Sequence, residues 1–164
     1  MTVSAQMGKM WAERRRVYLD NAATTCVSDT AFEAMEPFLR GAFGNPSALY
    51  AEARAARVAV EQAREEIASL IGAAPHEVYF TSCGTESDNW AIKGGMRAQA
   101  KAKGRKGRFV TSAFEHPAVL NSARALADEG FDVAYASVTD GGMVDEASFA
   151  QALGNEADLT SVML

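Results

Sequence analysis

The chain has 164 residues and a formal net charge of −5 at pH 7, because 21 Asp and Glu outnumber 16 Lys and Arg. Its 48% hydrophobic and 23% charged content is typical of a globular domain and argues against disorder. The acidic balance argues against nucleic-acid binding, and no apolar run is long enough to span a membrane.

Cysteine and histidine are both scarce. Cys26 and Cys83 are too few for a disulfide framework, and residues 1–16 lack the long apolar core of a signal peptide. We therefore expect a reducing, cytoplasmic setting. His76 and His116 are not spaced as metal ligands, so no metal site is predicted.

The chain is predicted to begin with irregular structure and a first helix. We expect residues 1–16 to form an irregular leader, which a short extended run at residues 17–19 follows. Ser28 or Asp29 can cap a helix that runs to about Leu39.

The clearest helical pattern covers residues 50–71 and follows a turn at residues 41–46. Apolar residues recur there at steps of four and three and form one stripe. The stripe consists of Ala56, Val60, Ala63, Ile67 and Leu70. Arg57 and Glu61 are spaced as a surface ion pair, and Gly72 is suited to end the helix.

Strands and helices then alternate to the end of the chain. The predicted strands cover residues 77–82, 108–113, 132–137 and 159–164. The predicted helices cover residues 85–102, residues 117–129 with a stop at Gly130, and a segment from Asp145 through Leu153. This alternation predicts an α/β layer fold with a largely parallel sheet.

Residues 97–108 hold six basic residues and no acid. One interpretation is a contact with an anion or a nucleic acid. The other is a solvated helix end, where cations are favourable. The acidity of the whole chain favours the helix end.

Residues 80–89 combine a predicted strand, a turn of small residues and a helix start. A helix N-terminus binds phosphate through unpaired N–H groups, and Gly84 lets the backbone approach a ligand closely. Ser82, Thr85 and Ser87 can add hydroxyl donors. The alternative is an ordinary helix cap at Ser82 or Thr85.

His116 lies just after a predicted strand and just before a helix that starts with Pro117. Ligands of open parallel sheets bind at the carboxyl ends of the strands, so the turns at Gly84 and His116 are expected at the same edge. His116 could stack on an aromatic cofactor or move a proton. The alternative is a surface histidine beside a helix cap.

Four motifs occur in one order, and together they resemble the N-terminal part of a cysteine desulfurase. They are Tyr18–Thr25, Phe43–Ser47, Phe80–Asn89 and Glu115–Val119. That family consists of class V aminotransferase-type enzymes that use pyridoxal 5′-phosphate (PLP), and the third motif most resembles the nitrogenase-associated type. The resemblance implies the PLP-dependent transferase fold type I, with residues 17–164 as the N-terminal part of the large domain.

The resemblance also implies roles for individual residues. Gly84 and Thr85 match the positions that hold the cofactor phosphate. His116 matches the histidine that stacks on the pyridine ring and assists proton transfer. Three further residues match loops at the substrate site, and these are Ala23, Thr24 and Asn45.

The implied reaction removes sulfur from L-cysteine and leaves L-alanine and a persulfide on a mobile cysteine. The implied partners are a sulfur acceptor or an iron–sulfur scaffold protein, and the full-length enzyme is expected to be a cytoplasmic homodimer. Neither Cys26 nor Cys83 matches the persulfide cysteine by position.

Members of the family are more than twice as long as this sequence. Their Schiff-base lysine and persulfide cysteine fall beyond Leu164, so we expect a truncated large domain that is inactive as 164 residues alone. Two alternatives stay open. One is a non-catalytic interaction or dimerisation fragment, and the other is a different class V enzyme such as a selenocysteine lyase.

Overall fold

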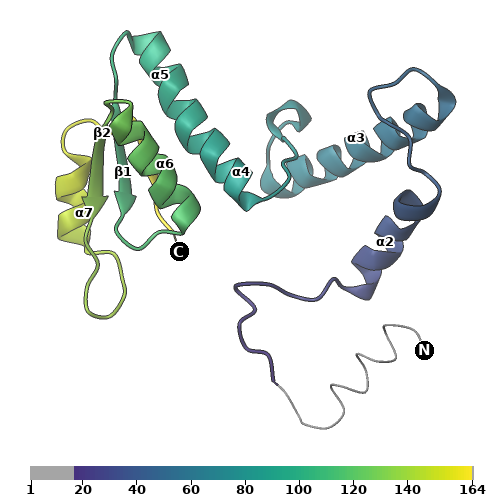
Figure 1. Ribbon diagram of the computed structural model, residues 1–164, viewed down its shortest axis with the longest axis horizontal. Helices are drawn as coiled ribbons and strands as arrows, with labels where there is room; N and C mark the ends of the chain where they lie inside the picture. The colour runs from purple at the N-terminus through teal and green to yellow at the C-terminus, as the bar shows by residue number, and fades with distance from the viewer. Residues whose placement is uncertain (1–16, 164) are drawn as a thin grey trace. The chain divides into compact units, whose positions relative to one another are not determined.

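The computed structural model describes residues 17–163, and the predicted irregular leader lies outside them. The chain divides into two compact units, Met1–Val78 and Tyr79–Leu164. Figure 1 labels the helices and strands of both units. No helix among the described residues is both long and apolar enough to span a membrane.

The first unit contains the helix α2, Asp29–Arg40. Ser28 is its N-cap, and the Ser28 hydroxyl oxygen accepts a hydrogen bond from the Ala31 N–H at 3.2 Å. This bond satisfies one of the N–H groups that a helix start leaves unpaired. The predicted helix and its cap are confirmed.

The helix α3, Ala51–Ile71, follows and ends at Gly72, which has a left-handed φ of 70°. The predicted helix and its stop are confirmed, but the predicted Arg57–Glu61 ion pair is wrong. The Arg57 guanidinium instead donates to the carbonyls of Pro46 and Ala48, both at 2.8 Å. These two backbone acceptors fix the loop before α3 and leave Glu61 to pair with another arginine of the helix.

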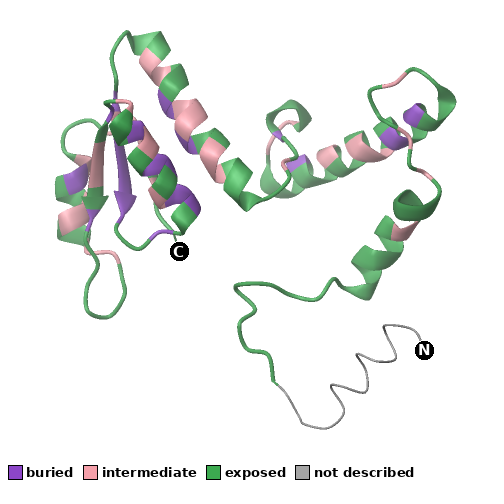
Figure 2. Cartoon of the chain, viewed as in Figure 1, coloured by how far each residue is buried: buried purple, intermediate pink, exposed green. Residues whose placement is uncertain are grey.

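Most of the predicted apolar stripe of α3 is exposed to solvent (Figure 2). Ile67 is 38% exposed and Leu70 85% exposed. The buried residues of α3 are all alanines, at positions 53, 56 and 68. Periodicity identifies the apolar face of a helix but not the element that covers it.

The predicted strand at residues 77–82 is wrong. A short 3-10 turn, η1 (Pro75–Glu77), occupies its start, and the Glu77 carboxylate closes this turn by accepting from the Ala74 N–H at 2.8 Å. Residues 78–82 join no strand in the part of the chain that the structure describes. A strand requires a hydrogen-bonded neighbour, which the pattern of β-forming residues does not supply.

The second unit begins with an unbroken helical stretch of three segments. These are α4 (Gly84–Asn89), the π-helix η2 (Trp90–Gly94) and α5 (Gly95–Lys103). The predicted helix at 85–102 is therefore confirmed, with one wider π turn inside it.

Three parallel strands form the sheet in the order β2-β1-β3. The strands are β1 (Arg108–Ser112), β2 (Asp132–Ala136) and β3 (Leu159–Ser161). The helix α6 (Pro117–Asp128) connects β1 to β2, and α7 (Glu146–Leu153) connects β2 to β3. The predicted α/β class with a parallel sheet flanked by helices is confirmed.

Each face of the sheet has its own apolar core. On one face Phe109 packs with η2, α5 and α6, and on the other Val110 packs with Ala152 of α7. These alternate residues of β1 point to opposite faces, and both are fully buried. Burying an aromatic or branched side chain of this size contributes roughly 1.5–3 kcal/mol. The two cores therefore anchor β1 between the helices that cover the two faces of the sheet.

Most of the basic residues at 97–108 contact acidic side chains of the same unit. Arg97 pairs with Glu129, and both Lys103 and Arg105 pair with Asp158. These ion pairs favour the interpretation of this stretch as a helix end over that of an anion-binding patch.

Candidate functional site

The starts of α4 and α6 lie at the same end of the second unit. The two helices pack against each other and run in the same direction (Figure 1). Gly84 and Thr85 open α4, and His116 is the N-cap of α6. The three residues that the resemblance assigns to cofactor binding thus lie at the starts of two helices that pack against each other. Only His116 follows a strand of the sheet, because the predicted strand before Gly84 does not form.

Hydrogen bonds within the corner at residues 81–87 decide which hydroxyls stay available. The backbone N–H and the hydroxyl of Ser82 both donate to the Glu86 carboxylate at 2.7 Å. The Ser87 hydroxyl lies 2.7 Å from that of Thr81. Of the three predicted hydroxyl groups, only that of Thr85 has no protein partner among the described residues. The bonds from Ser82 also lower the pKa of Glu86.

Gly84 faces open space at the first position of α4. A Cβ placed there would meet no atom within 4 Å, and the Gly84 N–H has no acceptor within the described part of the chain. A helix start of this kind carries partial positive charge. The corner therefore offers an N–H group and the Thr85 hydroxyl to an anion.

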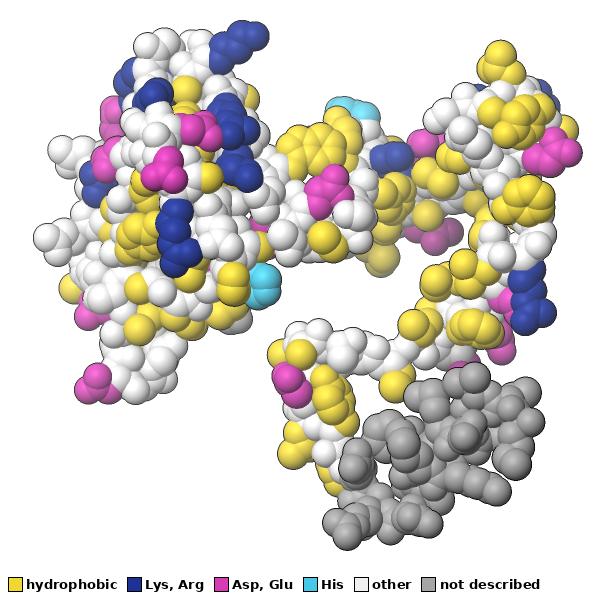
Figure 3. Space-filling model, viewed as in Figure 1, with side chains coloured by type: hydrophobic (Ala, Val, Ile, Leu, Met, Phe, Trp, Pro, Cys, Tyr) yellow, Lys and Arg dark blue, Asp and Glu magenta, His cyan; other side chains and the backbone are white. Residues whose placement is uncertain are grey.

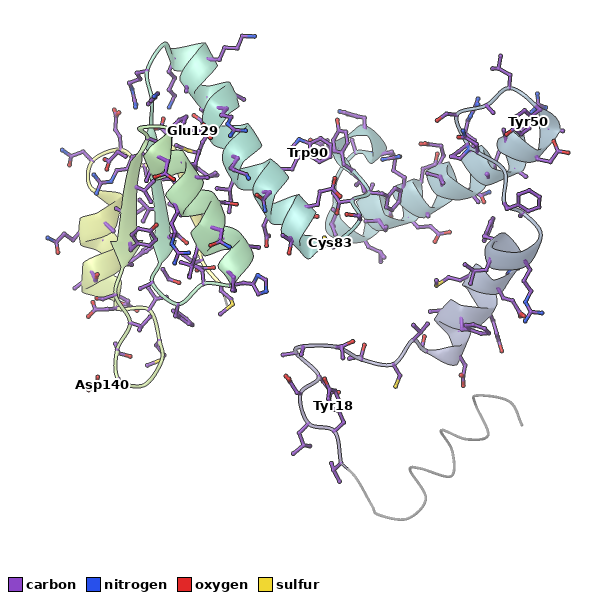
Figure 4. All side chains as sticks on the ribbon, viewed as in Figure 1. Tyr18, Tyr50, Cys83, Trp90, Glu129 and Asp140 are labelled. Carbon is purple, nitrogen blue, oxygen red and sulfur yellow. The ribbon has the colours of Figure 1, made fainter. Side chains whose placement is uncertain are left out.

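Cys83 precedes Gly84 as the N-cap residue of α4 (Figure 4). Its thiol is free and exposed. The Glu86 backbone N–H is the main cause that lowers the pKa of the thiol, and the Ser82 hydroxyl is the second. The Ser82 oxygen lies 3.8 Å from the Cys83 sulfur. These contacts give Cys83 more thiolate character than a cysteine in water.

His116 presents an exposed imidazole at the start of α6. Its Nδ1 accepts a hydrogen bond from the Ala118 N–H at 3.1 Å. In the neutral ring the proton therefore lies on Nε2. Figure 3 shows the histidine side chains in cyan at the molecular surface. The cap thus fixes one ring nitrogen and leaves the other accessible.

Glu115 is a buried carboxylate beside this histidine, and sequence reasoning assigned it no role. It is 6% exposed. Its Oε1 accepts from the Ser112 hydroxyl at 2.6 Å and from the Met163 N–H at 2.7 Å. The only sequence signal is its place in the fourth motif, since its donors come from separate parts of the chain.

The predicted substrate-loop residues belong to the first unit. The Ala23 and Thr24 N–H groups form a turn on the Asp20 carbonyl, at 3.1 and 3.5 Å. The Asn45 Oδ1 accepts from the Ser47 N–H at 2.9 Å. Ala23, Thr24 and Asn45 are exposed. These loops therefore belong to a different unit from Gly84 and His116.

The second unit also carries an apolar groove of about 690 Å³. Phe114, Met143, Phe149 and Val162 are among the residues that line it. None of the predicted site residues contributes to the groove. Residues 17–163 contain no group of three or more His, Cys, Asp or Glu that could hold a metal ion.

Comparison with known proteins gives a consistent result. A profile of the aminotransferase class-V family matches residues 17–164. The cysteine desulfurase IscS of Dictyoglomus turgidum is 46% identical over 151 residues, and that of Methanosarcina thermophila is 43% identical over the same length. Each alignment covers 92% of this chain and 37% of the relative. The chain thus spans well under half the length of the curated relatives it matches.

Two solved structures are similar along most of the chain. One is described as a NifS-like protein and has a TM-score of 0.80 at 37% identity, covering 90% of this chain and 40% of that chain. The other, SspA in complex with cysteine, has a TM-score of 0.78 at 37% identity, covering 90% of this chain and 42% of that chain. These similarities extend over both units.

Proposed function

The chain belongs to the aminotransferase class-V family, whose members are PLP-dependent enzymes, and we propose that the protein is a cysteine desulfurase. It would remove sulfur from L-cysteine and leave L-alanine and an enzyme-bound persulfide. One structural observation carries this proposal. The packing of α4 on α6 places an open helix start beside an exposed histidine.

The donors at this corner suit the phosphate of PLP. The Gly84 N–H and the Thr85 hydroxyl have no protein partner among the described residues. A Cβ at Gly84 would point into open space, so a phosphate can approach the backbone there. Helix starts bind phosphate through N–H groups and the helix dipole. We therefore assign the phosphate to Gly84 and Thr85.

The exposed ring of His116 suits the aromatic part of the cofactor. The bond from the Ala118 N–H to Nδ1 limits rotation of the imidazole, so its plane is set before binding. Nε2 stays accessible and carries the proton of the neutral ring, which it can donate near the bound substrate. PLP supplies the electron sink of the reaction when it is bound.

The substrate loops of the first unit are assigned from the resemblance. Ala23, Thr24 and Asn45 would line the L-cysteine site. The Arg57 bonds to Pro46 and Ala48 support this assignment for Asn45, because they hold its loop in one conformation. The solved structure of SspA, which contains cysteine, is similar to this chain and supports L-cysteine as the substrate.

We further propose a cytoplasmic homodimer that passes sulfur to an acceptor or to an iron–sulfur scaffold protein. In this proposal residues 17–164 form the N-terminal part of the large domain. The 164 residues alone would bind PLP without turning over cysteine. Lys103 contacts the Asp158 carboxylate, and Lys106 contacts the Glu129 carbonyl. These contacts direct both lysines to residues outside the proposed site.

A PLP titration of the 164-residue chain tests the proposal. Absorbance and fluorescence should report saturable binding, and either Thr85→Ala or His116→Ala should weaken it about tenfold, the scale of one or two hydrogen bonds to a charged group. His76→Ala is the matched control, because His76 is an exposed histidine of the first unit. Equal affinity for all four proteins would contradict the proposed site.

A further inference from the structure

We propose that Glu115 is a positioning residue that fixes the orientation of His116 toward the cofactor. The inference rests on the proposed function for the role of His116. It rests on the contacts of Glu115 for everything else.

The burial of Glu115 indicates that its carboxylate has a specific task. A charged group that is 6% exposed is costly to bury unless donors compensate for the lost water. Two donors do so here, the Ser112 hydroxyl at 2.6 Å and the Met163 N–H at 2.7 Å. Both bonds end on the same oxygen, Oε1, which makes Glu115 a bridge between the two donors.

The bridge joins segments that are far apart in the sequence. Ser112 is the last residue of β1, and Met163 lies two residues after the end of β3. These strands are neighbours in the sheet. Glu115 therefore ties the turn between β1 and α6 to the segment that leaves the adjacent strand, and the turn cannot move independently of the sheet.

His116 follows Glu115 directly in the sequence, so the hydrogen bonds of Glu115 also restrict the backbone at His116. Its backbone has φ −55° and ψ 145°, an extended conformation that turns the chain into α6. The Ala118 N–H holds Nδ1 on one side, and the Glu115 bridge holds the preceding peptide on the other. Loss of the bridge would free the turn and let the imidazole leave its set plane.

The consequence for binding is loss of preorganisation. Stacking requires the imidazole plane to be parallel to the cofactor ring, and small displacements of a positioned group are costly. We expect Glu115→Ala to weaken PLP binding about tenfold. Glu115→Gln should retain most of the affinity, because its amide oxygen can accept from the same two donors.

Nuclear magnetic resonance on the ¹⁵N-labelled 164-residue chain tests the bridge without the cofactor. The variants are Glu115→Ala, Glu115→Gln and, as control, Asp128→Asn, which changes an exposed carboxylate at the far end of α6. The readouts are hydrogen exchange of the Met163 amide and the imidazole ¹⁵N shifts of His116. PLP affinity is then measured for each folded protein.

We expect a protected Met163 amide in the wild type, and its loss in Glu115→Ala together with averaged His116 shifts and weaker PLP binding. Glu115→Gln should rescue all three. A stability role alone would lower the melting temperature but leave the His116 shifts and the PLP affinity unchanged, and that result overturns the inference. If Glu115→Ala does not fold, Ser112→Ala removes one donor and is read in the same way.

Different results would contradict the proposed function and the proposed role of Glu115. Absence of PLP binding to the wild type, with the Met163 and His116 responses as expected, would contradict the proposed function and leave the Glu115 bridge in place. Normal PLP binding with unaltered His116 signals in Glu115→Ala would contradict the positioning role of Glu115 alone.

Discussion

Two glycines in the recognised motifs differ in the space around them. A Cβ on Gly44 would lie 2.9 Å from the Ala53 backbone N and still closer to the Glu52 carbonyl. Backbone atoms of α3 cannot move aside as a flexible side chain can. We expect Gly44→Ala to lower the free energy of unfolding of the first unit by about 2 kcal/mol, as measured by urea denaturation.

Gly84→Ala is the matched control for this prediction. Because a Cβ there meets nothing within 4 Å, the free energy of unfolding should change by about 0.5 kcal/mol or less. PLP binding should nevertheless weaken, since the added methyl group would occupy the space assigned to the phosphate. A large stability loss in Gly84→Ala, or none in Gly44→Ala, would contradict this account of the two positions.

Asp158 is the acidic residue that Lys103, Arg105 and the Arg108 backbone N–H all contact. Its carboxylate is almost fully buried and accepts from Lys103 Nζ at 2.5 Å and from the Arg108 N–H at 2.8 Å. The Lys103 bond is the main cause that lowers the pKa of Asp158 from 3.8 to about 2. The carboxylate therefore stabilises the fold above pH 3.8, and this contribution is lost as pH falls through about 2.

Thermal melts between pH 7 and pH 2 test this dependence. Asp158→Asn should melt below the wild type at pH 7, because it loses the attraction to Lys103. The difference should shrink as pH falls from about 4 toward 2, where the wild type also becomes neutral. Asp140→Asn, at the tip of the loop after β2 (Figure 4), should show no such pattern. A gap that stays constant with pH would exclude the ion pairs as its cause.

Among the elements, α7 depends on one capping side chain. The Asp145 carboxylate accepts from the Ser148 N–H at 2.9 Å at the start of the helix. Asp145→Ala should lower the free energy of unfolding by about 1 kcal/mol, whereas Asp145→Asn should cost only a few tenths because asparagine also caps. Urea denaturation followed by circular dichroism measures both, and equal losses would show that the cap is not responsible.

The elements that sequence reasoning placed correctly have local causes. Ser28 and Asp145 cap their helices through bonds to residues three positions on, and Gly72 and Gly130 adopt positive φ where helices end. The predicted strand at 77–82 failed because pairing depends on a distant partner. The exposure of the α3 stripe escaped prediction for the same reason.

The features of the candidate site also differ in whether they depend on local sequence or on distant residues. Gly84, Thr85 and His116 could be named from motifs because helix starts and glycine positions are local features. The tautomer of His116 and the use of Ser82 by Glu86 depend on short-range geometry that a motif does not specify. The bridge from Glu115 to Met163 joins residues 48 positions apart and has no sequence signature.

At the scale of the whole molecule, the first unit leaves two apolar helix faces exposed. The α2 face consists of Phe32, Met35 and Leu39, and the α3 face of Ile67, Leu70 and Ile71. Water-exposed apolar patches of this kind are typical of surfaces that other protein segments cover.

These faces predict self-association of the 164-residue chain. Light scattering over a range of concentrations should show a molar mass that rises above 17.5 kDa, because each contact removes apolar area from water. Phe32→Gln on the α2 face and Leu70→Gln on the α3 face should each shift association to higher concentration. Glu33→Gln, which changes an exposed polar residue of α2, should not. A monomer at every concentration would mean that these faces do not drive association, and the proposed homodimer would then need another interface.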